Sequence, residues 1–199
     1  LPILVDRANT HAYTGFFQYP ELFRKLSPNV QSVGLEFARK NLERRFSGEV
    51  GVDMLYSTQS AYVKEANFQE RVLDLSTKPK ILVAIHDFFD SPHSYGNNLF
   101  PDFWEWLLAL ARIADQTDYS WYIKTHPDIK GDGDIILKDF VEKHTRFTLL
   151  SPQTSHHQII EEGISLGLTI FGTIAVEYPY LGIPVICASV NNPHIRYQF

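Results

Sequence analysis

The chain has 199 residues, of which 44% are hydrophobic and 21% are charged, and its formal net charge is -5. This composition is typical of a folded globular protein, and the negative charge gives no general attraction to nucleic acid, so we expect no nucleic-acid partner. The single cysteine, Cys187, excludes an internal disulfide and favours a cytoplasmic location. Because the chain begins at Leu1 rather than at a methionine and stops at Phe199 just after a predicted strand, we expect it to be part of a longer protein.

Residues 1–78 show no regular alternation of strands and helices, and we expect them to form a mostly helical segment from an interdomain region. The stretch 19–26 predicts a short helix entered through Pro20, and the stretch 31–46 predicts a longer one. In the longer helix, apolar residues recur at near-helical spacing and predict a single buried stripe. The stripe consists of Val33, Phe37, Leu42 and Phe46.

Four basic residues of the longer predicted helix lie mostly off this stripe. They are Arg39, Lys40, Arg44 and Arg45. A solvated helix face is the favoured interpretation, and the alternative is a peripheral contact with a membrane surface or with a lipid-linked acceptor. The polar stretch 74–80 then predicts a linker into the domain that follows.

Residues 79–199 alternate predicted strands with predicted helices. The predicted strands are 81–89, 119–127, 146–152, 166–172 and 183–189, and the predicted helices are 103–115, 134–144, 155–163 and 173–182. Asp102 is the expected N-cap of the first of these helices. Alternation of this kind predicts the α/β class, with a Rossmann-like parallel sheet of about five strands flanked by helices. We expect this domain to follow the mostly helical segment.

After the fourth predicted strand, a candidate phosphate-binding turn and a carboxylate lie one helical turn apart. In an open α/β sheet, ligands bind beyond the carboxyl ends of the strands. Gly172 and Thr173 lie there and can present backbone N–H groups and a hydroxyl to a phosphate, or they can simply form a tight turn with an N-cap. Glu177 follows on the predicted helix, where its carboxylate can accept two hydrogen bonds from a ribose diol or can be an ordinary exposed glutamate.

The second and third predicted strands end in further polar residues. Lys124 and His126 come at the end of the second strand, immediately before Pro127, which ends the strand. His126 can donate a hydrogen bond to a phosphate oxygen or act as an acid at a leaving group, because its ordinary pKa is near neutrality; the alternative is a histidine without a role. The third strand leads into the polar stretch 151–157, which begins at Ser151.

Several common site motifs are missing from the sequence. No pair of histidines or cysteines has the spacing of a metal site, so we expect no bound metal. No glycine-rich loop of the P-loop or dinucleotide type occurs, and no nucleophile-elbow motif occurs either. These absences argue against P-loop nucleotidases, nicotinamide dehydrogenases and α/β-hydrolases.

The stretch 122–128 (YIKTHPD), followed by the stretch 168–186 (LTIFGTIAVEYPYLGIPVI), resembles the donor-binding half of GT-B glycosyltransferases. Within these, it looks most like the bacterial capsule and surface polysaccharide biosynthesis group. The resemblance covers roughly residues 80–192 and rests on two motifs and their order. One departure is the Tyr178–Tyr180 segment, where these families usually have small residues, and it affects the length and aim of the helix.

The resemblance implies roles for particular residues. Four would lie around the phosphates of a nucleotide sugar: Lys124, His126, Gly172 and Thr173. Glu177 would bind the ribose, Ser151 would lie near the base, and His126 is also the candidate catalytic residue. The implied enzyme is a cytoplasmic glycosyltransferase that needs no separate cofactor and uses a glycan or lipid-linked acceptor, with its catalytic base in another domain.

Two alternatives to the transferase stay open at the level of sequence. Sugar-nucleotide epimerases of the same fold have a similar segment, so the chain can belong to an epimerase. A chain with the same motifs can also be a non-catalytic nucleotide-binding module of a polysaccharide assembly complex. Fold-level resemblance alone does not separate these functions.

Overall fold

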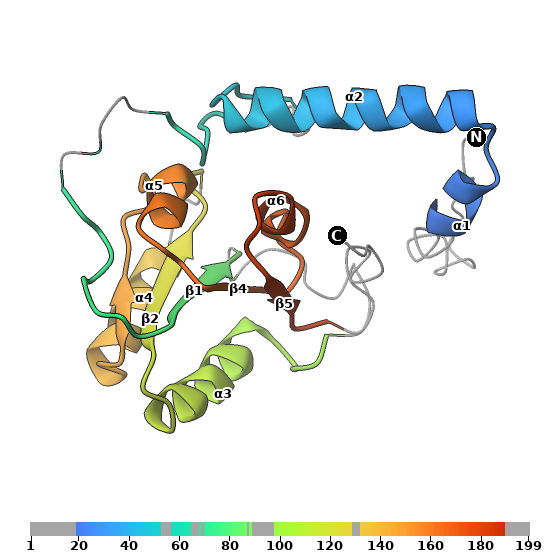
Figure 1. Ribbon diagram of the computed structural model, residues 1–199. Helices are drawn as coiled ribbons and strands as arrows, with labels where there is room; N and C mark the ends of the chain where they lie inside the picture. The colour runs from blue at the N-terminus through green and yellow to red at the C-terminus, as the bar shows by residue number, and fades with distance from the viewer. Residues whose placement is uncertain are drawn as a thin grey trace.

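A five-stranded parallel sheet lies at the centre of the molecule (Figure 1). The computed structural model describes residues 19–52, 57–64, 68, 70–86, 88, 98–128 and 132–189. The strands are β1 (Lys80–Ile85), β2 (Ser120–Thr125), β3 (Phe147–Leu149), β4 (Leu166–Thr169) and β5 (Val185–Cys187). Their order is β3-β2-β1-β4-β5, with parallel pairing throughout. The predicted α/β class and Rossmann-like sheet are therefore confirmed.

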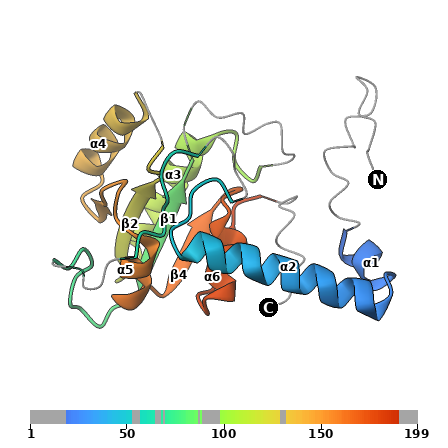
Figure 2. The same ribbon diagram turned by 90° about the horizontal axis from the view of Figure 1, so that it is seen from above.

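Helices cover both faces of the sheet (Figures 1 and 2). The helices α3 (Phe103–Asp115) and α4 (Gly133–Lys143) pack on one face, and α5 (His156–Glu161) and α6 (Ile174–Tyr180) pack on the other. Successive residues of a strand point to opposite faces, so Val83 contributes to the core under α3 and α4, whereas Leu82 contributes to the core under α5 and α6. Burial on both faces explains why β1 is continuously apolar after Lys80.

Local signals in the sequence set the ends of two helices. The side chain of Asp102 accepts a hydrogen bond from the backbone N–H of Glu105 at 2.8 Å, which confirms the predicted N-cap of α3. The helix α6 is only seven residues long and includes Pro179 in its last turn. Gly182 follows with a φ of 84°, a left-handed conformation that favours glycine and ends the helix. The tyrosine-proline-tyrosine segment forms the last residues of α6, just before this turn.

The helices α1 (Tyr19–Arg24) and α2 (Pro28–Phe46) precede the sheet, and α2 extends well beyond it in both views (Figures 1 and 2). Only the C-terminal end of α2 is buried, where Phe46 contacts the rings of Tyr62 and Tyr180. The predicted single buried stripe is wrong, because the side chains of Val33 and Phe37 are 64% and 67% exposed. These two residues lie on the part of α2 that projects away from the sheet.

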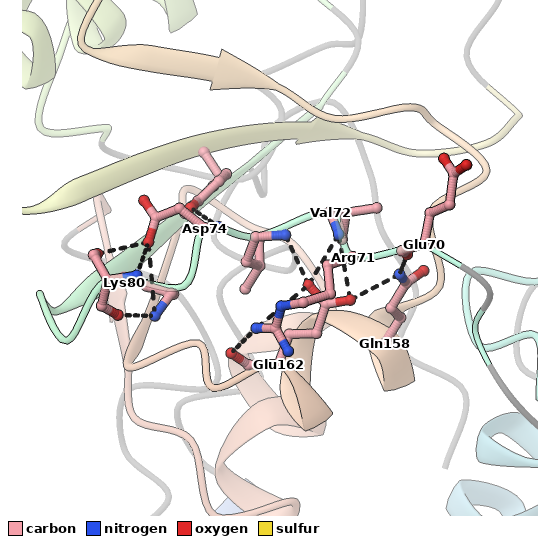
Figure 3. A network of polar contacts seen from close by, with 10 residues as sticks. Glu70, Arg71, Val72, Asp74, Lys80, Gln158 and Glu162 are labelled. Atoms are coloured by element: carbon pink, nitrogen blue, oxygen red, sulfur yellow. Dashed lines mark hydrogen bonds and ion pairs between the residues drawn. The ribbon is translucent and has the colours of Figure 1, made fainter.

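Residues 70–73, which lead into the stretch predicted as a linker, are held against the sheet domain (Figure 3). The carboxylate of Glu162, directly after α5, accepts hydrogen bonds from the backbone N–H groups of Val72 at 3.0 Å and Leu73 at 2.7 Å. Gln158 donates to the backbone oxygen of Glu70 at 2.6 Å, and Leu73 is buried in the core under α5. The segment before β1 is thus part of the packed structure rather than a free connection.

A second set of contacts fixes the residues closer to β1, also in Figure 3. The carboxylate of Asp74 accepts a hydrogen bond from the hydroxyl of Ser120, at the start of β2. The ammonium group of Lys80 donates to the backbone oxygen of Ser76 at 2.8 Å. Together with the Glu162 contacts, these bonds join residues 70–80 to two strands and one helix.

We predict that Glu162→Ala lowers the free energy of unfolding by about 1.5–3 kcal/mol, the range for hydrogen bonds to a charged group. The substitution leaves the backbone N–H groups of Val72 and Leu73 without their acceptor. Urea unfolding measures the change. The control is Glu161→Ala, because Glu161 is its exposed neighbour. Equal losses in the two variants would show that Glu162 does not hold the segment in place.

Candidate functional site

The candidate site lies at the carboxyl ends of the strands, on the side covered by α5 and α6. The strand order reverses between β1 and β4, and ligands of open α/β sheets bind at such a reversal. Thr173 follows β4 at the start of α6, and His126 follows β2 on the other side of β1. The C-terminal end of α2 lies beside α6 (Figure 2), so a helix from outside the sheet borders the site.

Glu177 and Arg45 form an ion pair between the Oε1 atom of Glu177 and the Nε atom of Arg45. The other carboxylate oxygen of Glu177 accepts a hydrogen bond from the hydroxyl of Tyr62 at 2.9 Å. Arg45 also donates from Nη2 to the hydroxyl oxygen of Thr173 at 3.1 Å. Burial, followed by the charge of Glu177, raises the pKa of Tyr62 well above its usual value, so Tyr62 stays protonated as the donor. These contacts join Glu177 and Thr173, two residues predicted for the site, to Arg45 on α2.

The burial of Glu177 differs from the sequence-based expectation. Of the two interpretations open from the sequence, the ordinary exposed glutamate is wrong, because the residue is only 3% exposed. Burial is compatible with the charged form because Arg45 and Tyr62 occupy both carboxylate oxygens. Arg45 differs in the same way from the solvated helix face expected for its basic cluster, because its side chain is only 15% exposed. Whether Glu177 binds ribose stays a prediction.

Gly172 allows β4 and α6 to approach closely. Its backbone N–H donates to the hydroxyl of Thr169 at 3.0 Å. A Cβ atom at this position would lie 2.5 Å from the same hydroxyl oxygen, too close for any larger residue. One of the N–H groups predicted to bind a phosphate is therefore already used within the protein.

Lys124 lies beneath the rim and is only 2% exposed. Its ammonium group donates to the backbone oxygens of Thr125 and Pro152, each at 3.0 Å. Within the described ranges, no carboxylate forms an ion pair with it, and burial lowers its pKa to about 8. Lys124 therefore contributes positive potential from below the site and fixes the loop after β3.

Of the two basic residues predicted for the site, Lys124 and His126, His126 is the more exposed, with 38% of its side chain accessible. Its Nδ1 atom accepts a hydrogen bond from the backbone N–H of Asp128 at 3.1 Å, so the proton of the neutral ring is on Nε2. Burial lowers the pKa of His126, the charge of Asp128 opposes that shift, and the charges of Lys124 and Arg45 add to it. A neutral His126 can therefore donate one hydrogen bond from Nε2.

The residues bordering His126 form a small cleft between the end of α2 and the end of β2. Tyr62 and Arg45 line it together with the segments 49–51 and 57–61. Thr58 is joined to the rim because its backbone N–H donates to the carboxylate of Asp128 at 3.0 Å. Ser151 is not among the lining residues. Its exposed hydroxyl donates to the side-chain oxygen of Gln153 at 2.9 Å, away from the cleft.

Two adjacent histidines of α5 complete the neighbourhood of the site. The Nδ1 atom of His156 lies 2.6 Å from the hydroxyl oxygen of Tyr178, and the Nε2 atom of His157 lies 2.6 Å from the backbone oxygen of Phe46. Burial lowers the pKa of His156 well below its usual value. Four neighbouring basic groups lower it further: Lys124, His126, Arg45 and His157. Basic groups therefore predominate among the charges that act on His156.

Sequence reasoning missed Arg45 and Tyr62 as site residues. Both belong to the segment before the sheet, where no motif marks them. The one usable signal was Glu177 itself, since a charged residue on an apolar helix needs a partner when it is buried. That signal did not identify which of the basic residues is the partner.

Comparison with known proteins finds no matching family model, no matching curated protein and no matching solved structure. Within the described residues, no group of three or more His, Cys, Asp or Glu side chains is placed to hold a metal ion. In the same parts of the chain, none of the helices has the length and apolar character needed to cross a bilayer. The site is therefore interpreted from its own geometry.

We predict that stability rises with pH between about 8 and 10.5 because of Lys124. Burial lowers its folded-state pKa from 10.5 to about 8, so the unfolded chain binds more protons in this window. The neutral variant Lys124→Met removes this contribution, which is on the order of 3 kcal/mol over the window. Urea unfolding of both proteins at several pH values measures the difference.

The control for this experiment is Lys143→Met, because Lys143 is exposed and paired with Asp139. Its stability should follow the same pH dependence as the wild type. Parallel curves for the wild type and Lys124→Met would instead show that Lys124 keeps its ordinary proton affinity in the folded protein.

Proposed function

We propose that this chain is the nucleotide-sugar-binding part of a glycosyltransferase that builds a surface polysaccharide. The observation that carries the proposal is the concentration of basic groups at the carboxyl edge of the sheet, in a protein whose net charge is -5. Lys124, His126 and Arg45 gather where the strand order reverses. A local excess of positive charge in an acidic protein favours an anionic ligand, and a nucleotide sugar carries its charge on phosphates.

The chemistry of glycosyl transfer suits this arrangement. When the sugar leaves, negative charge develops on the phosphate of the departing nucleotide, and preorganised donors stabilise it. The Nε2 proton of His126 and the hydroxyl of Thr173 can donate to phosphate oxygens, while Lys124 adds positive potential from below. His126 is in this proposal the group nearest the leaving phosphate.

The resemblance of the two sequence motifs to GT-B donor-binding domains supports the transferase over other nucleotide-binding functions. The Rossmann-like sheet agrees with it at the level of fold. The acceptor, a glycan or a lipid-linked saccharide, would be bound with the help of another domain. An epimerase or a non-catalytic module would use the same phosphate-binding edge, so activity has to separate these functions.

We predict that a nucleotide raises the melting temperature of the protein. The panel consists of UDP, GDP, CDP and CMP. A ligand at about 100 times its Kd stabilises the folded state by about 2.7 kcal/mol, which corresponds to roughly 5–10 °C for a chain of this size. His126→Ala should bind the same nucleotide more weakly, because it removes one phosphate donor.

The control variant is His144→Ala, since His144 packs against Phe140 on the opposite face of the sheet. It should bind nucleotide as the wild type does. If none of the four nucleotides raises the melting temperature, the proposed function is wrong. With a binding nucleotide identified, its sugar conjugate can be assayed with and without an acceptor. Acceptor-dependent release indicates a transferase, interconversion of the sugar indicates an epimerase, and neither indicates a module.

A further inference from the structure

We infer that Arg45 binds the phosphate of the ligand directly, and that Glu177 is the positioning residue for Arg45 rather than the acceptor of the ribose diol. The inference rests on the proposed nucleotide-binding function and adds a ligand-binding residue from α2. It also changes the role predicted for Glu177 from sequence. The ligand class it names is a diphosphate or a phosphate ester, recognised through its phosphate oxygens.

Both carboxylate oxygens of Glu177 already have partners within the protein. Its Oε1 atom is paired with Arg45, its Oε2 atom accepts from Tyr62, and the residue is 3% exposed. A ribose diol would have to displace one of these partners and reach a buried carboxylate. Displacing Arg45 would leave a buried cation without its counter-charge, which is strongly unfavourable. The carboxylate is therefore best suited to holding Arg45.

Only part of the guanidinium group of Arg45 is used in the contacts with Glu177 and Thr173. A guanidinium group has five N–H donors arranged as a planar fork. The Nε group faces Glu177, and Nη2 donates to Thr173. Within the described part of the chain, Nη1 donates to no protein acceptor, and Arg45 lines the cleft. Two N–H groups on Nη1 thus remain for a ligand, with the fork geometry that suits phosphate oxygens.

Two further hydrogen-bond donors, Thr173 and His126, lie near Arg45. Thr173 accepts from Arg45 through its hydroxyl oxygen, so its own hydroxyl proton is available to donate. His126 lines the same cleft and carries its ring proton on Nε2. Donors from α2 and from the end of β2 therefore border one opening, and Thr173 at the start of α6 adjoins it through its hydrogen bond with Arg45.

The charges around Arg45 agree with an anionic ligand. Glu177 is its one ion-pair partner within the described ranges, and the other charged groups acting on the neighbouring His156 are basic. The carboxylate of Asp128 interacts with His126, and Glu49 borders the opening while paired with Arg44. Lys124, buried beneath the rim without an ion-pair partner in the described ranges, is the cation whose charge a bound anion would balance.

The test begins with Arg45→Gln, titrated by calorimetry with inorganic pyrophosphate and with UDP, GDP, CDP and CMP. Loss of a charge-assisted contact should weaken binding of pyrophosphate and of the bound nucleotide by about 10- to 100-fold. The matched control is Arg39→Gln, on the same helix. Arg39 is exposed and paired with Glu36 and Glu43, so its replacement should leave affinity unchanged.

The second variant, Glu177→Gln, separates the positioning role from a ribose-binding role. If Glu177 acts through Arg45, the variant loses affinity for pyrophosphate, for the nucleotide and for its 2′-deoxy form by the same factor. If Glu177 binds the ribose diol, pyrophosphate affinity is unchanged and the loss is confined to the ribonucleotide. The second pattern would overturn the inference.

The double variant Arg45→Gln/Glu177→Gln guards against loss of folding, because it leaves no buried charge without a partner. It should bind no more weakly than Arg45→Gln alone, since a positioning residue has no effect once its target is gone. A further loss in the double variant would contradict the positioning role. Melting curves check that each variant is folded before titration.

The outcomes also separate this inference from the proposed function. If the wild type binds a nucleotide but Arg45→Gln binds it equally well, the inference is wrong and the proposed function stands. If the wild type binds pyrophosphate in an Arg45-dependent way but no nucleotide, the phosphate site stands and the proposed function is wrong. If the wild type binds none of these ligands, both are wrong.

Discussion

The ion pair between Arg45 and Glu177 is the interaction on which the arrangement of the site depends. A buried carboxylate is costly unless a cation and hydrogen bonds compensate for its lost hydration. Arg45 and Tyr62 provide that compensation, and both come from the chain before the sheet. The charge of one residue on α6 therefore requires that α2 and the segment around Tyr62 pack against the sheet domain, and this packing creates the cleft beside His126.

The electrostatics of the rim follow from the same packing. Bringing Arg45 close to Lys124 and His126 puts several basic groups into a partly buried space with few acids, and burial together with their mutual repulsion lowers the pKa of both histidines at the centre, His126 and His156. Such an arrangement opposes folding in isolation, and a bound anion would relieve it. Groups with strongly perturbed pKa values in a cleft are often found at functional sites, and this supports the proposed phosphate-binding role.

The segment between α2 and β1 has a structural role of its own. Glu162 holds the backbone of Val72 and Leu73, and Asp74 reaches the start of β2. These contacts hold the segment across α5 on the way to β1, while residues earlier in it border the cleft. Anchoring residues 70–80 in this way also helps to keep Tyr62 in reach of Glu177. Val63, next to Tyr62, accepts a hydrogen bond from Ser155 at the start of α5, and Glu70 accepts one from Gln158 in the same helix.

The amino-acid sequence by itself determined the parallel sheet, because strands that alternate with helices pair in parallel through right-handed crossovers, and it determined the start of α3, because an N-cap is a local interaction between Asp102 and Glu105. It also placed Lys124, His126 and Thr173 at one edge, since the carboxyl ends of parallel strands share that edge. Only the tertiary structure decided that Glu177 is buried, that Arg45 rather than Arg39 is its partner and that the polar stretch 74–80 is anchored. The reason is physical: Tyr62 and Glu177 are 115 positions apart, and the pairing of such distant residues depends on how whole elements pack, which no local pattern of residues encodes.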